Sequence, residues 1–255
     1  MEDIKKLRDL TGAGIVDCKK ALDETGGDLD KAVDLLRKKG GAKAAKKADR
    51  ATNEGLIDIA QDGGKKVSIV KISCETDFVA RTDDFLNFVK EVAEAGLTGS
   101  GEEFFNNKKD EMVLKVGENL TFGGGEVLEG EYVSTYKHSN NKVATVVAFN
   151  KEVGGSLGVD IAMQAAAMSP SYLFPEEVPT EEMEREKDIY REQLKTEGKP
   201  EEMIEKILIG KMNKYYEEVC LIKQLSIKED KKSVEQVLKE VDPELKIVKF
   251  VRYSL

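Results

Sequence analysis

The segments EGLIDIAQDGGKKVSIVKI (residues 54–72) and EGEYVSTYKHSNNKVATVVAF (residues 129–149) decide the fold of this chain. Each begins with Glu-Gly and continues as a strand, a polar turn, Lys-Val and a second β-branched strand. That order is typical of a β-hairpin. We expect a helix after each copy, over residues 82–95 and about 158–168. The repeat therefore predicts an α+β fold whose core is duplicated, each half being a hairpin followed by a helix.

The junction between strand and helix differs between the two copies. The first copy has CETDFVARTDD at residues 74–84, where the aromatic Phe78 stands among charged residues. The second copy has NKEVGGSLG at residues 150–158, with no aromatic. One interpretation is that Phe78 packs in the core beneath the helix that carries Phe85. The other is that Phe78 is held out for a partner, and the absence of a counterpart in the second copy favours it.

Residues 1–40 carry three apolar runs at helical spacing, separated by glycine-containing breaks. They predict a small three-helix module. The runs are Ile4, Leu7 and Leu10, then Ile15, Cys18 and Leu22, then Leu29, Ala32, Val33 and Leu36, with Asp28 as the cap of the third helix. Val16 lies off the face of the second run, so we expect it to be exposed. So small a module has a marginal core and suits docking better than chemistry.

Residues 41–53, GAKAAKKADRATN, are rich in alanine and lysine and carry no apolar stripe. We interpret them as a linker that is helical in part. A basic nucleic-acid patch is the alternative, using Lys43, Lys46, Lys47 and Arg50. No aromatic residue is interleaved there for base stacking, which weighs against it.

Residues 180–228 have apolar residues spaced by about 3.5, with charges between them. This pattern predicts an antiparallel helical hairpin with a coiled-coil seam, whose second helix begins at Pro200. The seam residues are Met183, Ile189, Tyr190, Leu194, Ile204, Ile207, Leu208, Met212, Tyr215, Val219 and Ile222. One more helix and a final strand follow, and we expect that strand to join the sheet of the second half.

These segments give the expected domain organisation. It consists of a three-helix module at 1–40, a linker at 41–53, a first core subdomain at 54–128 and a second at 129–255. The helical hairpin is an insertion in the second subdomain, at about 180–228.

The composition narrows the function. The 255 residues carry a net charge of −9, and an acidic chain is a poor candidate for general nucleic-acid binding. The three cysteines are odd in number and form no CxxC pair, so neither a zinc site nor a disulfide framework is indicated. Free thiols fit the reducing cytosol. The N-terminus has no apolar signal core, and no run approaches the roughly 20 apolar residues that span a bilayer, so we expect no membrane association.

No motif for catalysis or cofactor binding is found. The glycine-rich FGGGE at residues 122–126 lacks the phosphate-binding loop pattern and is interpreted as a loop or hairpin turn. His138 is the only histidine, which excludes a multi-histidine metal site. It lies beside a polar turn, where an exposed surface residue is expected. We therefore expect no enzyme chemistry, no metal and no cofactor.

Five segments together resemble one family. LRDLTGAGIVDCKKAL (7–22) and VKISCETDFVAR (70–81) are similar to the two signature segments of bacterial-type elongation factor Ts. MQAAAMSPSYLFPEEVP (163–179), EGKPEEMIEKI (197–207) and YYEEVCLIKQ (215–224) are similar to the same family and occur in the same order. One such segment alone is weak, whereas five in register over nearly the whole chain are highly specific.

The resemblance implies a function in translation elongation. The family is the guanine-nucleotide exchange factor of elongation factor Tu, a GTPase that it binds in the GDP-bound and nucleotide-free states. The family's parts are a helical N-terminal module resembling ubiquitin-associated domains, a two-part α+β core and a protruding coiled-coil hairpin. A cytoplasmic protein without covalent chemistry is expected.

The resemblance also implies contact residues. Thr76, Asp77, Phe78 and Val79 match the family's Thr-Asp-Phe-Val motif. In the family this motif enters the nucleotide domain of elongation factor Tu, wedges its Phe beside the phosphate-loop region and disturbs the Mg²⁺ site. Arg81 closes the same segment and is included among the expected contacts.

Three further contact residues follow from the resemblance. Ile15 and Val16 match an apolar pair that contacts a helix of the same domain of the partner, and His138 matches a histidine that approaches the partner's third domain. A function of another class stays open beside these expectations. It is a non-catalytic assembly or chaperone-like adaptor that uses the helical hairpin and binds without speeding GDP release.

Overall fold

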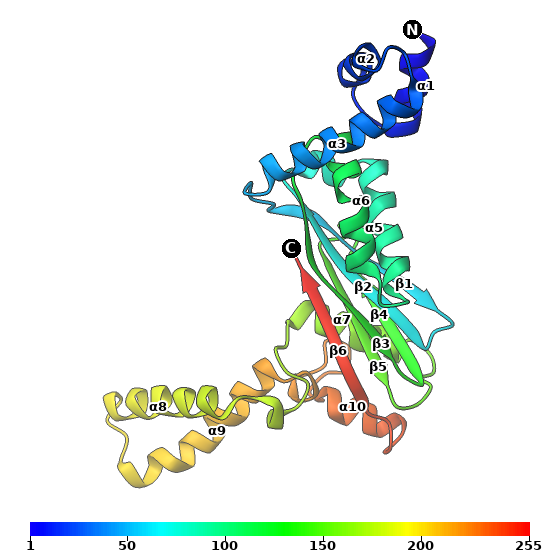
Figure 1. Ribbon diagram of the computed structural model, residues 1–255. Helices are drawn as coiled ribbons and strands as arrows, with labels where there is room; N and C mark the ends of the chain where they lie inside the picture. The colour runs from blue at the N-terminus through cyan, green and yellow to red at the C-terminus, as the bar shows by residue number, and fades with distance from the viewer. The chain divides into compact units, whose positions relative to one another are not determined.

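The computed structural model describes all residues, 1–255 (Figure 1). The chain forms two compact units. The first consists of Met1–Val127, Lys137–Ala144 and Tyr253–Leu255, and the second of Leu128–Tyr136 and Thr145–Arg252. The chain therefore passes more than once between the units.

The first unit begins with the three predicted helices, which are confirmed as α1 (Glu2–Thr11), α2 (Ile15–Glu24) and α3 (Leu29–Lys47). The first break works through Gly12, whose φ of 66° ends α1 in a left-handed conformation that favours glycine. The third helix begins where predicted, because the Asp28 carboxylate accepts a hydrogen bond from the Lys31 N–H at 3.1 Å.

Fewer residues are buried between these helices than the apolar pattern predicted. Leu7, Cys18 and Leu36 are fully buried. Leu10 and Ile15, however, are 68% and 57% exposed, so their assignment to the packed face is wrong. They lie at the end of α1 and the start of α2, where the connecting turn closes the core with the fully buried Ala13.

Helix α3 continues through residues 41–47 and packs on α6 (Gly101–Val116). A Cβ atom at Gly40 would lie 3.0 Å from the Asp110 carbonyl oxygen, so glycine permits this close approach. Ala44 is buried in the core cluster of the first sheet. Sequence reasoning did not identify α6, because its helical face buries few large residues among many charges.

Two cations of residues 43–50, those of Lys43 and Lys47, are engaged within the chain. The Lys43 ammonium lies 2.8 Å from the Asp17 carboxylate, and that of Lys47 donates to the Gly117 carbonyl. These contacts tie the basic segment to α2 and to the end of α6.

The first sheet contains β1 (Glu54–Asp62), β2 (Lys66–Cys74) and β3 (Leu120–Glu129), in the order β1-β2-β3. The predicted hairpin of β1 and β2 is antiparallel, with Ile59 opposite Ile69. The predicted helix after it is α5 (Asp83–Gly96), which lies against β1 and β2 (Figure 1). Its buried face includes Phe85, Phe88 and Val92, so this layer is the core of the first unit.

Residues 122–126 lie inside β3, so their interpretation as a loop or turn is wrong. The glycines serve close packing. A Cβ atom at Gly123 would lie 2.9 Å from the Lys71 side chain. One at Gly124, where φ is 136°, would lie 3.0 Å from the Tyr253 hydroxyl. Neighbouring side chains thus occupy the space that larger residues in this strand would need.

The second unit has the sheet order β4-β5-β6, from β4 (Tyr132–Lys137), β5 (Val143–Phe149) and β6 (Ile247–Ser254). The final strand therefore joins the second predicted hairpin, as expected. Helix α7 (Leu157–Met168) follows β5, and α10 (Val234–Val241) precedes β6. The buried cluster includes Phe149, Ile161, Leu221 and Leu238. The fold is thus α+β, with N-terminal helices and two three-stranded antiparallel sheets.

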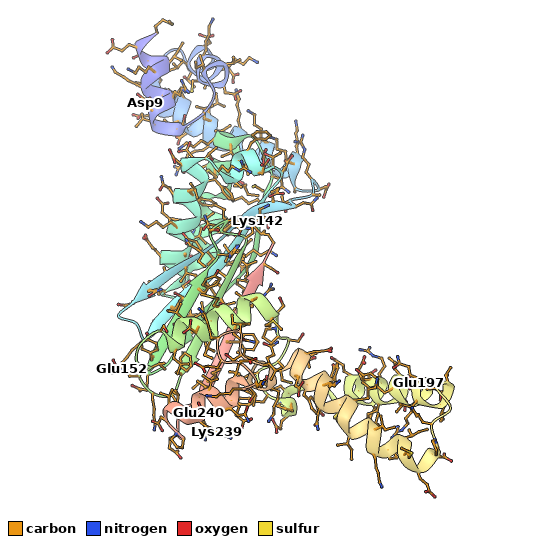
Figure 2. All side chains as sticks on the ribbon, turned by 180° about the vertical axis from the view of Figure 1, so that it is seen from behind. Asp9, Lys142, Glu152, Glu197, Lys239 and Glu240 are labelled. Atoms are coloured by element: carbon orange, nitrogen blue, oxygen red, sulfur yellow. The ribbon has the colours of Figure 1, made fainter.

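The predicted helical hairpin is formed by α8 (Thr180–Thr196) and α9 (Glu201–Val219), which lie side by side (Figure 1). Glu197 marks the turn at its tip (Figure 2). Short 3₁₀ turns, η1 (Pro175–Glu177) and η2 (Leu221–Lys223), flank the two helices. The buried seam includes Leu194, Ile204, Leu208, Met212 and Tyr215.

Two residues assigned to that seam lie elsewhere. Ile189 is 43% exposed and is not part of the apolar cluster of the hairpin, and Ile222 packs in the core cluster of the second sheet. At the base of the hairpin the Glu182 carboxylate accepts hydrogen bonds from the hydroxyls of Tyr172, at 2.7 Å, and Tyr215. The hairpin is therefore fastened where it leaves the core.

Candidate protein-binding site

Phe78 lies on α4 (Asp77–Ala80), a single helical turn between β2 and α5. Two threonines explain why the chain turns here. The Thr76 hydroxyl oxygen accepts from the Val79 N–H at 3.4 Å, and that of Thr82 accepts from the Phe85 N–H at 3.3 Å. Thr76 thus caps the single turn of α4, and Thr82 caps α5. The local sequence therefore ends the strand, makes one turn and starts α5 within a few residues.

The side chain of Phe78 is 80% exposed. The two residues that follow, Val79 and Ala80, are buried at 9% and 4% exposure. The core position beneath the helix is filled by Phe85, which is fully buried. The interpretation of Phe78 as a core residue is therefore wrong, because α4 directs Val79 and Ala80 inward and the ring outward.

The turn is held from the side by Glu118, which precedes β3. One carboxylate oxygen of Glu118 accepts from the backbone N–H groups of Glu75, at 3.1 Å, and Thr76, at 3.0 Å. The other accepts from the Thr76 hydroxyl at 2.6 Å. Hydrogen bonds to a charged acceptor are stronger than neutral ones. Two of them hold the backbone at residues 75 and 76, and the third holds the Thr76 side chain, two residues before the exposed ring.

Asn119 extends this support to the segment after α3. Its backbone N–H donates to the Glu75 carboxylate at 2.7 Å. Its side-chain amide donates to the carbonyl oxygens of Ala48, at 3.2 Å, and Arg50, at 2.8 Å. Arg50 in turn lies 3.5 Å from the Glu75 carboxylate. The end of β2, the start of β3 and residues 48–50 are therefore held together.

Sequence reasoning missed both Glu118 and Asn119. A Glu-Asn pair before a strand is a weak signal by itself. It becomes informative only when β3 is known to lie beside β2, since residues 118–119 then meet residues 75–76 just beyond the ends of neighbouring strands.

Asp77 and Arg81 form an ion pair across α4, with 2.8 Å between the guanidinium and the carboxylate. Their side chains are 42% and 79% exposed, so the pair contributes little to folding, typically about 0–1 kcal/mol. Both charges belong to the same short segment as the exposed ring.

The side chains of this turn are suited to contact with a protein. Burial and, to a lesser extent, the nearby Glu118 charge raise the pKa of the Cys74 thiol to about 12, so this thiol stays neutral. No group of three or more histidine, cysteine or carboxylate side chains is placed to hold a metal ion. An exposed aromatic ring on a rigid support is the kind of residue that dominates the energetics of protein interfaces.

The other expected contact residues lie on separate elements. Ile15 and Val16, which is 65% exposed as predicted, form the first turn of α2. His138 is exposed in the turn between β4 and β5, where its backbone N–H donates to the Val143 carbonyl at 2.9 Å. The structure thus brings Thr76 to Arg81 together on one braced turn and leaves Ile15, Val16 and His138 apart from it in the chain.

Comparison with known proteins gives a single result. The family model described as Elongation factor TS matches residues 75–255. The chain is 40% identical to Elongation factor Ts of Aquifex aeolicus (strain VF5), over 100% of this chain and 97% of that protein. Identity to Elongation factor Ts of Chlorobaculum parvum is 41% over the same shares, and to that of Hydrogenobaculum sp. (strain Y04AAS1) 42% over 93% and 92%.

These matches define a translation elongation factor of the nucleotide-exchange class, which is not an enzyme. The chain belongs to the elongation factor Ts family, the nucleotide exchange factors of elongation factor Tu. None of its helices is both long and apolar enough to cross a lipid bilayer.

Proposed function

We propose that this chain releases GDP from elongation factor Tu by inserting the Phe78 ring beside the partner's phosphate- and Mg²⁺-binding site. The observation that carries the proposal is the 80% exposure of Phe78 on a turn whose backbone is held by Glu118. Exposure of a large apolar ring to water is unfavourable, and the free energy falls when a partner covers the ring. Its support means that little ordering is needed on binding.

The exchange follows from coupling between two ligands of the partner. The factor binds the nucleotide-free partner more tightly than the GDP-bound one, and GDP then weakens the hold of the factor by the same ratio. A ring pushed into packed structure displaces peptide groups that hydrogen-bond the phosphates. Displacing Mg²⁺ removes the largest charge that neutralises those phosphates. No covalent bond forms or breaks in this cycle.

Within the turn the residues have different parts. Phe78 makes the apolar contact, and Asp77 with Arg81 supplies charges around it. Thr76 caps α4, and Val79, which is only 9% exposed, anchors the turn in the core. Together they keep the Phe78 ring exposed. Ile15 and Val16 form a second contact on the nucleotide domain, supported by their exposure of 57% and 65%, and His138 a third contact elsewhere on the partner.

The same proposal assigns roles to the segments. Residues 1–40 form a docking module like ubiquitin-associated domains, joined by residues 41–53 to core subdomains at 54–128 and 129–255. The hairpin at about 180–228 is a coiled-coil insertion in the second. We place the protein in the cytoplasm, where translation elongation takes place, and its three buried free cysteines are compatible with a reducing compartment.

A non-catalytic adaptor is the second candidate. The observation that favours it is the exposed apolar side chains of the hairpin, with Ile189 at 43%, Met203 at 51% and Ile209 at 66% exposure. A partner that covers these residues would be bound without any effect on nucleotide release.

Release of a fluorescent GDP analogue from purified elongation factor Tu, with and without this chain, separates the two functions. An exchange factor accelerates release at substoichiometric amounts, whereas an adaptor binds and leaves the rate unchanged. Raising free Mg²⁺ at constant ionic strength should lower the apparent affinity of the factor for the GDP-bound partner. If release is accelerated but the affinity is independent of Mg²⁺, the metal does not take part and only the phosphate-binding peptides are displaced.

A further inference from the structure

Glu118 is the residue outside the Thr-Asp-Phe-Val turn with the most direct hold on it. It lies between α6 and β3, far from the turn in sequence, and it is half-buried. Its carboxylate is the acceptor of three hydrogen bonds, all donated by Glu75 and Thr76. Both residues belong to the segment that leads into α4, so this contact fixes the point from which the short helix starts.

The Thr76 hydroxyl connects Glu118 to the helix. A hydroxyl has one proton to donate and lone pairs with which to accept. The proton goes to Glu118 at 2.6 Å, so a lone pair remains for the Val79 N–H at 3.4 Å. A carboxylate can only accept, and it therefore orients the hydroxyl in the direction that caps α4.

The geometry points to Glu118 as a positioning residue for nucleotide exchange, which sets the direction of the Phe78 ring through Thr76 and α4 without itself touching the partner. This inference rests on the proposed function of Phe78. It adds that the exchange rate depends on a residue 40 positions away in the chain from the ring that acts.

Glutamine at 118 has the same shape but cannot replace the carboxylate. It offers one acceptor oxygen and one amide group that donates. With the oxygen toward the two backbone N–H groups, the amide faces the Thr76 hydroxyl, whose proton then has no acceptor. With the amide turned the other way, its N–H donors face the backbone N–H donors of Glu75 and Thr76. Either arrangement loses at least one charge-assisted bond and loosens the turn.

The test is a double-mutant cycle on the full-length chain, with Glu118→Gln and Phe78→Ala, read out as release of a fluorescent GDP analogue from elongation factor Tu at saturating factor. We expect Glu118→Gln to lower the maximal rate by about tenfold. The half-saturating concentration should change by less than about threefold, since the contacted surface is unchanged. In the Phe78→Ala background the same substitution should change the residual rate by less than about twofold.

Glu103→Gln is the matched control, because Glu103 is an exposed glutamate on α6 that takes no part in the support of the turn. It should leave the exchange rate unchanged. Amide hydrogen exchange gives an independent readout. Glu118→Gln should speed exchange at residues 75–79 and leave the other core amides unaffected.

Two results would overturn the assignment. One is an unchanged maximal rate for Glu118→Gln. The other is the same loss in both backgrounds, which would show that Glu118 acts on stability and not through the ring. If the residual rate of Phe78→Ala is not above the spontaneous rate, unchanged amide exchange at residues 75–79 overturns the assignment instead. Failure of the proposed function is distinct, because Phe78→Ala itself would then exchange GDP at the wild-type rate.

Discussion

The two junctions that follow the central strands of the two sheets are held by similar hydrogen bonds. One of them exposes a large apolar side chain, and the other buries one. After β2, residues 75–76 are held by residues 118–119, which precede β3. After β5, Asn150 is held by the segment that precedes β6. Its side chain donates to the Glu244 carbonyl at 2.8 Å and accepts from the Lys246 N–H at 2.7 Å. In each sheet the start of the third strand thus fastens the end of the central one.

The two junctions differ in the exposure of their large apolar residue. In the second junction Val153 is 5% exposed and packs in the core cluster of its sheet. In the first junction Phe78 is 80% exposed. Because the support is similar in both, the fold alone does not require an exposed aromatic ring. The difference supports the proposal that the first junction presents its ring to another molecule, while the second closes a core.

The largest expected effect is on stability, and it separates Phe78 from a core phenylalanine a few residues away. Phe85→Ala should lower the free energy of unfolding by about 3–5 kcal/mol, because it leaves a cavity in a fully buried site. Phe78→Ala should lower it by about 1 kcal/mol or less, since the ring is mostly in water already. Denaturant titration of both variants measures this. Equal losses would mean that Phe78 is packed in solution, and the contrast between the two junctions would then be wrong.

In the second junction the expected effect is intermediate and concerns stability alone. Val153→Ala removes two buried methyl groups and should cost about 2 kcal/mol. The rate of GDP release per folded molecule should stay at the wild-type value. Unfolding curves and release rates on the same preparation check both points, and a lowered release rate would show that this junction also serves exchange.

A smaller effect is expected at the first turn of α2. Val16→Asp should weaken binding to elongation factor Tu by about tenfold, because it puts a charge into an apolar contact. Val241→Asp is the matched control, since Val241 is exposed to a similar extent, 63%, on α10 of the second unit. Calorimetric titration compares the two. Equal affinities would remove the N-terminal module from the interface.

The smallest expected effect concerns the reactivity of the Cys74 thiol at the end of β2, where the first junction begins. Cys74 is fully buried and the pKa of its thiol is raised to about 12, mainly by burial. A raised pKa keeps the thiol protonated, so at pH 8 it should react with a disulfide reagent as slowly as Cys220, whose pKa burial raises to about 11. Faster modification of Cys74 than of Cys220 would show that the first junction opens readily, against the braced turn described above.

Much of this architecture could be predicted from the local pattern. The Lys-Val repeat predicted both hairpins, and the spacing from Leu194 to Tyr215 predicted the helical hairpin. Helix α6 was missed because only three large buried residues, Phe105, Val113 and Leu114, mark its buried face among many charges. The strand at Gly123 and Gly124 was missed because these glycines make room for Lys71 and Tyr253, which only the tertiary structure brings there.

The candidate site divides in the same way. Phe78 could be identified from one aromatic residue in one copy of a repeat, and Val16 from its position off a helical face. The packing of Ile15 and Leu10 was predicted wrongly, because the core of three short helices ends at the buried Ala13. Glu118 and Asn119 could not be found, since their hydrogen bonds depend on the pairing of strands separated by three helices.

The rate of GDP release from elongation factor Tu at saturating Phe78→Ala, compared with wild type, tests the central claim most directly. The account predicts a loss of about a hundredfold, the size expected when one dominant aromatic contact is removed. It also predicts that the variant unfolds within about 1 kcal/mol of wild type. A folded Phe78→Ala that releases GDP as fast as wild type would contradict the account, because the exposed ring would then have no part in exchange.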